Sequence, residues 1–377
     1  MQIDYNTNKL ERFIPITFVE LEENILFLNI ANKEDTKKFA MLLRKIYHTI
    51  FHTQLLDIKK DYHSFNPDRD TITLKQYNNS ELKNIEDSFL KNMIPLLNSA
   101  NYEQLSQEEI NEAFEETSPY GVEVSVDFNE FDNILLFFRG SAIKQEKRRT
   151  LKKLFLKKED ISTQIYRRLF ILFKQKVDGK DLIYLKLFKD IPKSDLEMLF
   201  PNTKVKIALL DKVKLAVTGG GGTIAGSFTL LGKLAIALEP MALLSAIGAF
   251  GAIVWRQISS IFNHRVKYMA QLTKNLYFYN LDNNAGAISY ILDMAEDEES
   301  KEVFLSYMFL LQSKEPLSIE DLDLKIEQYI QEQYSVPMDF EIDDAIQKLV
   351  ALNLVIKLEN KYQAKSIQKS IEILTQY

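Results

Sequence analysis

Hydrophobic residues recur along the chain with two periods, one typical of helices and the other typical of strands. Residues 16–60 and 80–116 carry apolar side chains at helical spacing, so both segments predict helices with a polar side. The valines within residues 122–126 alternate with polar residues, and residues 134–138 form a short apolar run. Both patterns are typical of strands. A helical N-terminal region over residues 1–120 is therefore expected to lead into a part that contains strands.

We expect that next part to be a small α+β module over residues 121–205. Apolar runs at 165–173 and 182–188 predict two further strands, and residues 144–168 hold ten basic and three acidic residues. We interpret this basic stretch as an amphipathic helix whose charges are solvated and partly neutralised by the acidic segment before it. Alternatively, it docks on anionic lipid headgroups. The residues proposed for that contact are Lys147, Arg148, Arg149, Lys152 and Lys153.

The most apolar part of the chain is the block of residues 215–255, which carries only two charges, Lys233 and Glu239. Pro240 interrupts the block, because proline disfavours the helical conformation of the residue before it. A membrane span needs roughly 20 apolar residues, and each arm approaches this length if Lys233 and Arg256 extend toward the interfaces. The block therefore predicts a helical hairpin that inserts into a membrane.

Flanking charge and small residues support this hairpin, which we place at residues 206–265. Basic residues at both ends predict that both termini are cytoplasmic. Gly222 and Gly226 have the GxxxG spacing that lets helices pack closely, which would also permit a homo-oligomer. Two alternatives stay open: a hairpin that enters a single leaflet, and one buried inside the protein.

A run of four glycines, residues 219–222, opens the same block and has a second interpretation. Glycine-rich turns bind phosphate through backbone amides, and Gly220, Gly222 and Ala225 match the loose GxGxxA form of a dinucleotide site. The Walker spacing is absent, and no ribose-binding acid follows in a polar context. We therefore favour a kinked helix start, predict no cofactor, and keep Gly220 and Gly222 as weak candidates.

The C-terminal part predicts a helical connector over residues 266–299 and a winged-helix-like module over residues 300–377. In that module three helices precede a hairpin formed by residues 354–358 and 362–364. Residues 300–377 hold 13 acidic and eight basic residues, a composition that disfavours binding to nucleic acid. We expect the module to pack on other helices or to bind a protein partner.

Residues with catalytic chemistry are few. His48 and His52 lie one helical turn apart, as metal ligands can, but the spacing fixes no third ligand. We therefore predict no metal site and keep this pair as a weak candidate. The absence of cysteine excludes disulfides and thiolate zinc sites. No signature of a serine hydrolase or a kinase is present, so the chain leans away from an enzyme.

Five segments resemble the transmembrane protein 143 family: ERFIPI (11–16), FNPDRDT (65–71), FRG (138–140), YLKLFKDIPKSDLEMLFP (184–201) and YNLDNNAG (279–286). The resemblance implies a membrane protein with two spans, found in bacteria and in animal mitochondria. The shared domain of that family has no assigned function, and the resemblance supplies no catalytic residues. The acidic N-terminal region differs from a transit peptide. We therefore expect a bacterial inner membrane, or a mitochondrial membrane if the source is eukaryotic.

Together these patterns predict a mostly helical α+β protein with cytoplasmic helical and α+β modules, a two-helix membrane hairpin and a winged-helix-like module. The function that fits them is a membrane-anchored scaffold or adaptor, with membrane lipids and a protein as partners. One alternative is a nucleotide-binding protein or enzyme at the membrane surface, which would use the glycine-rich junction. Another is a lipid-binding or pore-forming oligomer.

Overall fold

The computed structural model describes most of the chain outside the apolar block. The described residues are 3–4, 10–28, 30–72, 74–115, 122–125, 131–149, 158–200, 204–207 and 277–377. The helices are α1 (Phe18–Phe27), α2 (Lys33–Tyr62), α3 (Asn79–Ser99), α4 (Gln107–Glu115), the 3-10 helix η3 (Lys193–Leu199), α8 (Asn284–Gln312), α9 (Ile319–Tyr334), α10 (Ile342–Ala351) and α11 (Ile367–Leu374). The strands are β1 (Ile3–Asp4), β2 (Glu103–Gln104), β3 (Val122–Ser125), β4 (Asp132–Arg149), β5 (Lys158–Val177), β6 (Lys180–Pro192), β7 (Lys204–Ile207), β8 (Asn280–Asn283), β9 (Val355–Leu358) and β10 (Lys361–Ala364).

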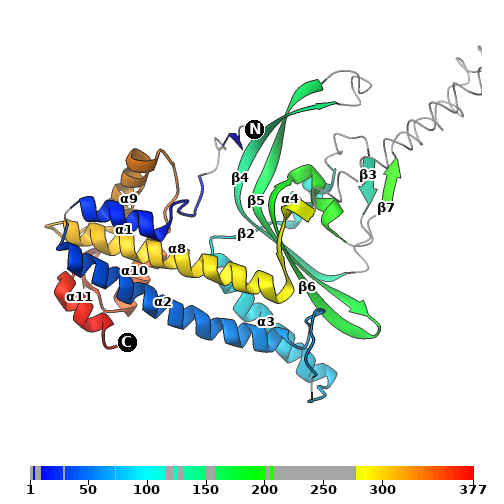
Figure 1. Cartoon of the computed structure of the whole chain (residues 1–377), viewed down its shortest axis with the longest axis horizontal. Coiled ribbons are helices and arrows are strands. Elements are labelled where there is room, and N and C mark those ends of the chain that lie inside the picture. The colour runs from blue at the N-terminus through cyan, green and yellow to red at the C-terminus, as the bar shows by residue number, and fades with distance from the viewer. Residues whose placement is uncertain are drawn as a thin grey trace, which may run out of the picture.

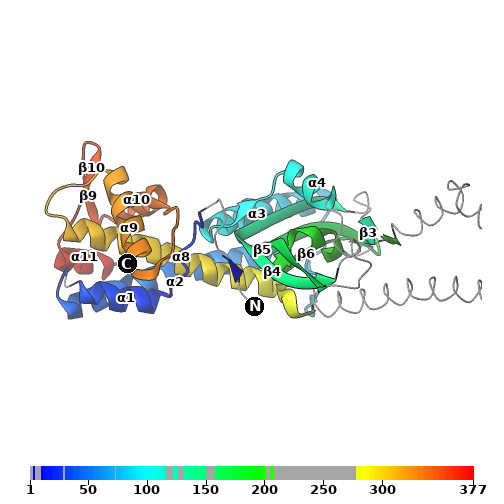
Figure 2. The same ribbon diagram turned by 90° about the horizontal axis from the view of Figure 1, so that it is seen from above.

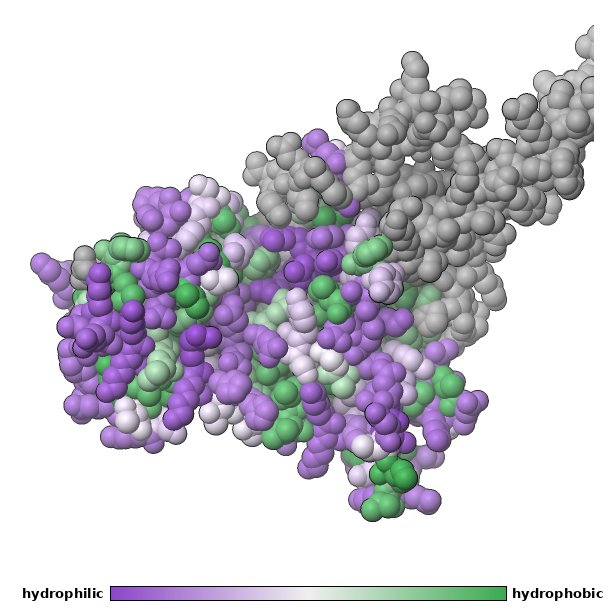
Figure 3. All heavy atoms as spheres, viewed as in Figure 1, coloured by the Kyte–Doolittle hydropathy of each residue, from purple (hydrophilic) through white to green (hydrophobic). Residues whose placement is uncertain are grey.

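Helices and sheet occupy opposite ends of an elongated body. The terminal helices α1, α9, α10 and α11 gather at one end, and the curved sheet of β4, β5 and β6 forms the other (Figures 1 and 2). The long helices α2 and α8 run side by side between the two ends. Polar side chains cover most of the visible surface of the described residues (Figure 3).

The main sheet has six antiparallel strands in the order β1-β4-β5-β6-β8, with β2 also paired to β4. Side chains alternate between its two faces, as the pleat requires. On β5, Phe170 and Leu172 belong to the core shared with α2, α3 and α8, whereas Leu169 and Ile171 pack with residues of α4 and η3. Because both faces of the sheet are covered here, residues on both sides of β5 are apolar, and the sequence of this strand contains a continuous apolar run.

The core of the helical end is built around α8. Residues 298–310 of this helix are all buried, so it is enclosed on every side over more than three turns. The apolar cluster around it extends from Ile14 to Leu374 and includes Phe170 of the sheet. Elements from both ends of the sequence therefore form one continuous core with the sheet.

The C-terminal elements follow the order of a winged helix. After α8, Leu317 pairs with Tyr362 of β10 in an isolated bridge, then come α9, α10 and the antiparallel hairpin β9–β10. Helix α11 packs against the core. Tyr307 of α8 donates a hydrogen bond to the hydroxyl oxygen of Ser370 in this helix at 2.9 Å. The three helices and hairpin expected over residues 300–377 are observed.

The predicted basic amphipathic helix is wrong. Residues 144–149 belong to β4, and residues 158–168 belong to β5. The stretch has few apolar residues and so resembled a solvated helix, but pairing between the two strands satisfies its backbone. The register places Lys147 opposite Asp160 and Arg148 opposite Glu159.

The predicted fold class and the membrane location are corrected as well. Instead of small α+β modules with a two-helix membrane hairpin, the described chain has one large antiparallel sheet packed against helices. None of the helices within the described ranges is both long and apolar enough to cross a membrane. Even α8, with 29 residues and a largely apolar second half, carries seven charged residues. Of residues 206–265, the first two end β7, and the rest lie outside the described residues.

Substitution of Gly140, which has a positive φ of 73°, tests how tightly the N-terminal segment packs on β4. A Cβ atom there would lie 2.6 Å from Glu11 Oε2 and 2.9 Å from the Phe13 ring. Gly179 in the β5–β6 turn has a similar φ of 78° with nothing within 4 Å, so it is the matched control. In urea unfolding we expect Gly179→Ala to lose about 1 kcal/mol from backbone strain alone. Gly140→Ala should lose a further 1–3 kcal/mol or so from crowding. Equal losses would contradict the tight contact.

Candidate functional site

The two histidines proposed as metal ligands lie on the exposed side of α2. Their rings stack with centroids 5.9 Å apart, and His48 Nδ1 lies 3.2 Å from a carboxylate oxygen of Glu296 on α8. The His48 side chain is 69% exposed. In the described part of the chain, no third ligand joins His48 and His52 at metal-binding distance. The arrangement is that of a surface contact between two helices.

The other sequence-predicted site residues are not brought together. Lys147, Arg148 and Arg149 lie at the far end of β4, two of them opposite acidic residues of β5. The remaining candidates lie outside the described residues; these are Lys152, Lys153, Gly220, Gly222, Gly226, Lys233, Glu239, Pro240 and Arg256.

A buried group of charges joins the sheet to the helices. Arg139 Nη2 on β4 donates to Glu298 Oε1 at 2.8 Å, and Lys301 Nζ lies 2.6 Å from the same oxygen. The other oxygen of Glu298 accepts from the backbone N–H of Ile14 at 2.9 Å. The side chains of Arg139, Glu298 and Lys301 are 10%, 2% and 3% exposed. Close pairing and backbone hydrogen bonds offset the cost of removing these charges from water. We call these three residues the Glu298 cluster.

The N-terminal segment before α1 closes over the Glu298 cluster. The ring of Phe13 lies 4.3 Å from the guanidinium carbon of Arg139 and 5.1 Å from that of Arg167, both within cation–π distance. Glu11 Oε1 accepts a hydrogen bond from the backbone N–H of Ser141 at 3.2 Å. The ERFIPI and FRG segments, distant in sequence, are therefore in direct contact.

Glu302 lies one turn along α8 from the Glu298 cluster and is almost fully buried. Asn101 Nδ2 donates to its Oε1 at 3.0 Å. Burial, and next the negative charge of Glu298, raise the pKa of Glu302 well above its usual value, and the Asn101 bond offsets part of this rise. The fold therefore favours the protonated form of Glu302.

Two carboxylates of α8 and one of α10 lie close together where the two helices meet. Ligand atoms of Glu299, Glu302 and Asp344 lie within 4.8 Å of one another, the one group among the described residues with the spacing of a metal site. Lys348 of α10 pairs with both Glu299 and Asp344. Burial lowers the pKa of Lys348 to about 7, but its amine already contacts two of the three carboxylates, so we interpret this group as a structural polar network between the two helices.

A second point of convergence is Asn284, the first residue of α8, which has a positive φ of 49°. Its Oδ1 accepts from Tyr62 OH and from the backbone N–H of Leu185, each at 3.1 Å. Its Nδ2 donates to Asp68. The FNPDRDT, YLKLFKDIP and LDNN segments therefore meet at one buried amide. This convergence is structural, because every polar atom of the Asn284 side chain is used in holding β6 to α2 and α8.

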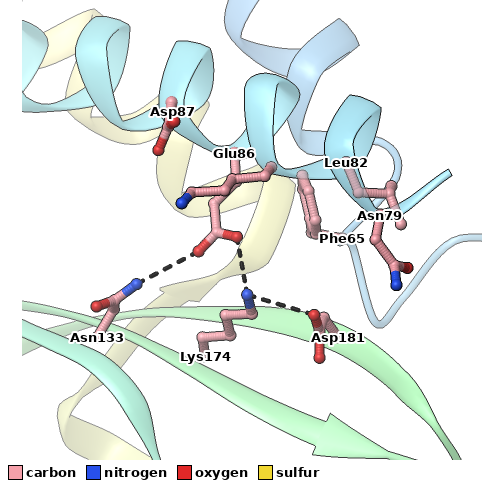
Figure 4. A pocket seen from close by; sticks show the side chains of 9 residues that line it. Phe65, Asn79, Leu82, Glu86, Asp87, Asn133, Lys174 and Asp181 are labelled. Carbon is pink, nitrogen blue, oxygen red and sulfur yellow. Dashed lines mark hydrogen bonds and ion pairs between the residues drawn. The ribbon is translucent and has the colours of Figure 1, made fainter. Parts of the chain in front are cut away.

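A cavity of about 420 Å³ lies between α3 and the sheet. Glu86 of α3 points toward the sheet, where Oε2 accepts from Lys174 of β5 at 2.8 Å and Oε1 from Asn133 of β4 at 3.4 Å (Figure 4). Lys174 also lies 3.3 Å from Asp181 of β6. Charged and amide groups from four elements thus converge on one cavity, as they do in small-molecule sites.

The exposed surface of the C-terminal module differs in charge from the surface of a winged helix that binds nucleic acid. Helix α10 begins with Asp343 and Asp344, and Val350 at its other end is 46% exposed. In the neighbouring hairpin, Ile356 and Leu358 of β9 are 45% and 44% exposed. We call Asp343, Gln347, Val350, Ile356 and Leu358 the α10 face. It combines acidic and aliphatic side chains.

Sequence reasoning missed the Glu298 cluster and the cavity for different reasons. The pattern over residues 266–299 predicts a helical connector and assigns no burial to its acidic residues. The signal for burial was the ten residues after Glu302, which are apolar on nearly every side and indicate a buried helix. Charges at the start of such a helix need partners. The cavity residues carry no motif, because Glu86, Asn133 and Lys174 come from three elements.

Comparison with known proteins gives one family match. Residues 131–286 match a family described as a protein of unknown function, DUF3754. The predicted resemblance to the transmembrane protein 143 family is therefore wrong, because the family model that matches is a different one. The matched span runs from the start of β4 to the first turn of α8, so it contains β4, β5, β6 and β8 of the main sheet. No solved structure matches the chain.

The Glu298 cluster predicts a large loss of stability when one partner is removed. Arg139→Met leaves Glu298 with Lys301 and removes the link to β4. We expect the free energy of unfolding in urea to fall by about 2–4 kcal/mol, since the buried Glu298 loses one of its two cationic partners and the side-chain tie of this cluster to β4 is removed. The matched control is Lys369→Met in the exposed Lys369–Glu372 pair of α11, where a change within about 0.5 kcal/mol is expected. Similar small effects for both would contradict a structural role of the cluster.

Glu302 predicts a stability difference that depends on pH. The folded protein holds this proton to higher pH than the unfolded chain, whose carboxyl has its usual pKa of about 4.5. As the pH rises above about 4.5, the unfolded chain releases this proton, whereas the folded protein must either retain it or ionise a buried carboxyl. Both cost free energy, so the stability of the wild-type protein falls. Glu302→Gln removes that penalty, so its stability relative to wild type should rise from pH 4.5 to pH 8. Glu315→Gln, at an exposed position, is the control. A difference that does not change with pH would refute the shift.

Proposed function

We propose that this chain is a scaffold or adaptor whose C-terminal module binds a basic segment of a protein partner through the α10 face. The single observation that carries the proposal is the chemistry of α10. In winged helices that read DNA, the corresponding helix carries cationic residues toward phosphates. Here it carries Asp343 and Asp344, and an aliphatic surface lies on α10 and the adjoining hairpin.

Negative charge around α10 extends onto neighbouring elements. Burial, then the carboxylates of Glu327 and Asp339, raise the pKa of Asp323 on α9 to about 6. Burial is the largest cause of this rise, and the nearby carboxylates add to it. A lysine- or arginine-containing segment would be attracted to this region, and the attraction would weaken with salt.

The aliphatic residues add a free energy of binding that the charges alone do not provide. Exposed side chains such as Val350 and Ile356 gain free energy when a partner covers them, roughly 25 cal/mol per Å² of apolar area. Charge would steer the partner, and burial of the aliphatic residues would hold it. Helix α8 supports this surface rigidly, because the same helix is packed in the core and tied to the sheet through the Glu298 cluster.

Photo-crosslinking in the source organism tests this function in the full chain. A photoreactive phenylalanine analogue replaces Gln347 or Ile356 on the α10 face. A third variant carries it at Leu56, a 58% exposed position on α2, as the matched control. We expect both α10-face positions to crosslink to the same protein through a basic peptide of that protein. Adding Asp343→Lys should abolish these adducts. The Leu56 position should give none of them.

Three outcomes would contradict the proposal. The first is the absence of adducts from Gln347 and Ile356 while the chain is folded and present at normal levels. The second is an identical adduct from Leu56, which would indicate nonspecific capture. The third is a crosslinked peptide that is acidic, or adducts that survive Asp343→Lys.

A further inference from the structure

The cavity between α3 and the sheet has a built polar floor. Glu86 is 8% exposed and uses both carboxylate oxygens, one for Lys174 and one for Asn133. Lys174 lies between two carboxylates, Glu86 and Asp181, and its side chain is 14% exposed. These groups hold one another in place before any ligand arrives, which lowers the entropy lost on binding.

The backbone at Asn133 is shaped to place its amide in this cavity. Asn133 has a positive φ of 52°, and the register of β4 against β5 shifts between Asp132 and Leu135. Bulges of this kind redirect side chains and occur next to functional sites. A non-glycine residue in the left-handed region is also uncommon, and asparagine tolerates it best. The irregularity directs the amide of Asn133 toward Glu86 (Figure 4).

Unused hydrogen-bonding capacity surrounds the floor. Lys174 has three N–H donors and two carboxylate partners, and Asn133 Oδ1 accepts no hydrogen bond from the described residues. The rim adds Asn79, Lys83 and Asp87 from exposed positions of α3. Both donors and acceptors therefore line the cavity, and Leu82 and Phe65 contribute apolar surface.

The charges of the cavity restrict the ligand class. Three carboxylates line it, so an anion would be repelled, and Lys174 already occupies the position between Glu86 and Asp181 where a cation would bind. With Lys83 and Lys174 against the three acids, the lining is close to neutral. A hydroxyl group donates to a carboxylate and accepts from an ammonium at once. A ligand with several adjacent hydroxyls would match this mixture of donors and acceptors without adding charge.

From this geometry we infer that the α3–sheet cavity binds a neutral polyhydroxylated small molecule of the size of a monosaccharide. Its hydroxyls bond to Asn79, Asn133, Lys174 and Asp181, and its less polar ring face lies on Leu82. The cavity volume of about 420 Å³ falls in the range of small-ligand pockets. The site is separate from the α10 face, since it is built from α3, β4, β5 and β6.

Ligand-observed NMR and calorimetry on the full chain test this inference. The probes are D-glucose, D-galactose, D-mannose and myo-inositol, with citrate and spermidine as charged probes at equal concentration. We expect at least one polyol to bind and neither charged probe to do so. Asn133→Gly keeps the positive φ but removes the amide, and Asn79→Ala alters the exposed rim. Each should raise the Kd about fivefold, as expected for a lost hydrogen bond. Asp57→Ala, at an exposed position of α2, should leave the Kd unchanged.

The inference is overturned if none of the four polyols binds the folded wild-type chain. It is also overturned if a polyol binds with the same affinity to both cavity variants, which would place binding elsewhere. Binding of citrate or spermidine in place of the polyols would assign the cavity to a charged ligand class instead. Thermal unfolding of each variant shows that it is folded, and Asn79→Ala keeps the test valid if Asn133→Gly is not.

Discussion

Enclosure of α8 is the constraint on which the rest of the structure depends. Its residues 298–310 are buried on all sides, yet the first turn of this stretch carries Glu298, Glu299, Lys301 and Glu302. Buried charges of this kind destabilise a fold unless they are paired. The pairing recruits the sheet through Arg139, the N-terminal segment through Ile14, and α10 through Lys348. Parts of the chain that are distant in sequence are thereby fixed to one helix.

This arrangement leaves two surfaces that the core does not use. The α10 face lies on the C-terminal module, and the α3–sheet cavity lies among α3, β4, β5 and β6. Both are supported by elements packed on the same continuous core, so each has a rigid base. The proposed protein-binding surface and the proposed small-ligand cavity are both consistent with the proposed adaptor. Burial raises the pKa of the Glu302 carboxyl well above its usual value, and this residue lies among structural contacts of α8.

Local patterns predicted the elements whose environment is uniform along their length. The helical spacing at residues 39–50 is observed in α2, and the apolar run at 165–173 is observed in β5. The basic stretch was misjudged because its strand conformation comes from pairing between β4 and β5, which no local pattern contains. For the candidate sites, the acidic character of the C-terminal module was visible in its composition. The cavity was invisible, because Glu86, Asn133, Lys174 and Asp181 come from four elements.

The sequence by itself determined the helices of both ends, the apolar strand segments, the order of the last helices and hairpin, and their negative charge. These features follow from side-chain periodicity and composition within short windows, where neighbouring residues share one environment. Only the tertiary structure decided which charges are buried, where Asn284 and Glu298 find their partners, and which side chains line a cavity. Many of those outcomes depend on contacts between residues far apart in the sequence, such as Ile14 and Glu298, and burial changes the energy of a charge far more than its sequence neighbours do.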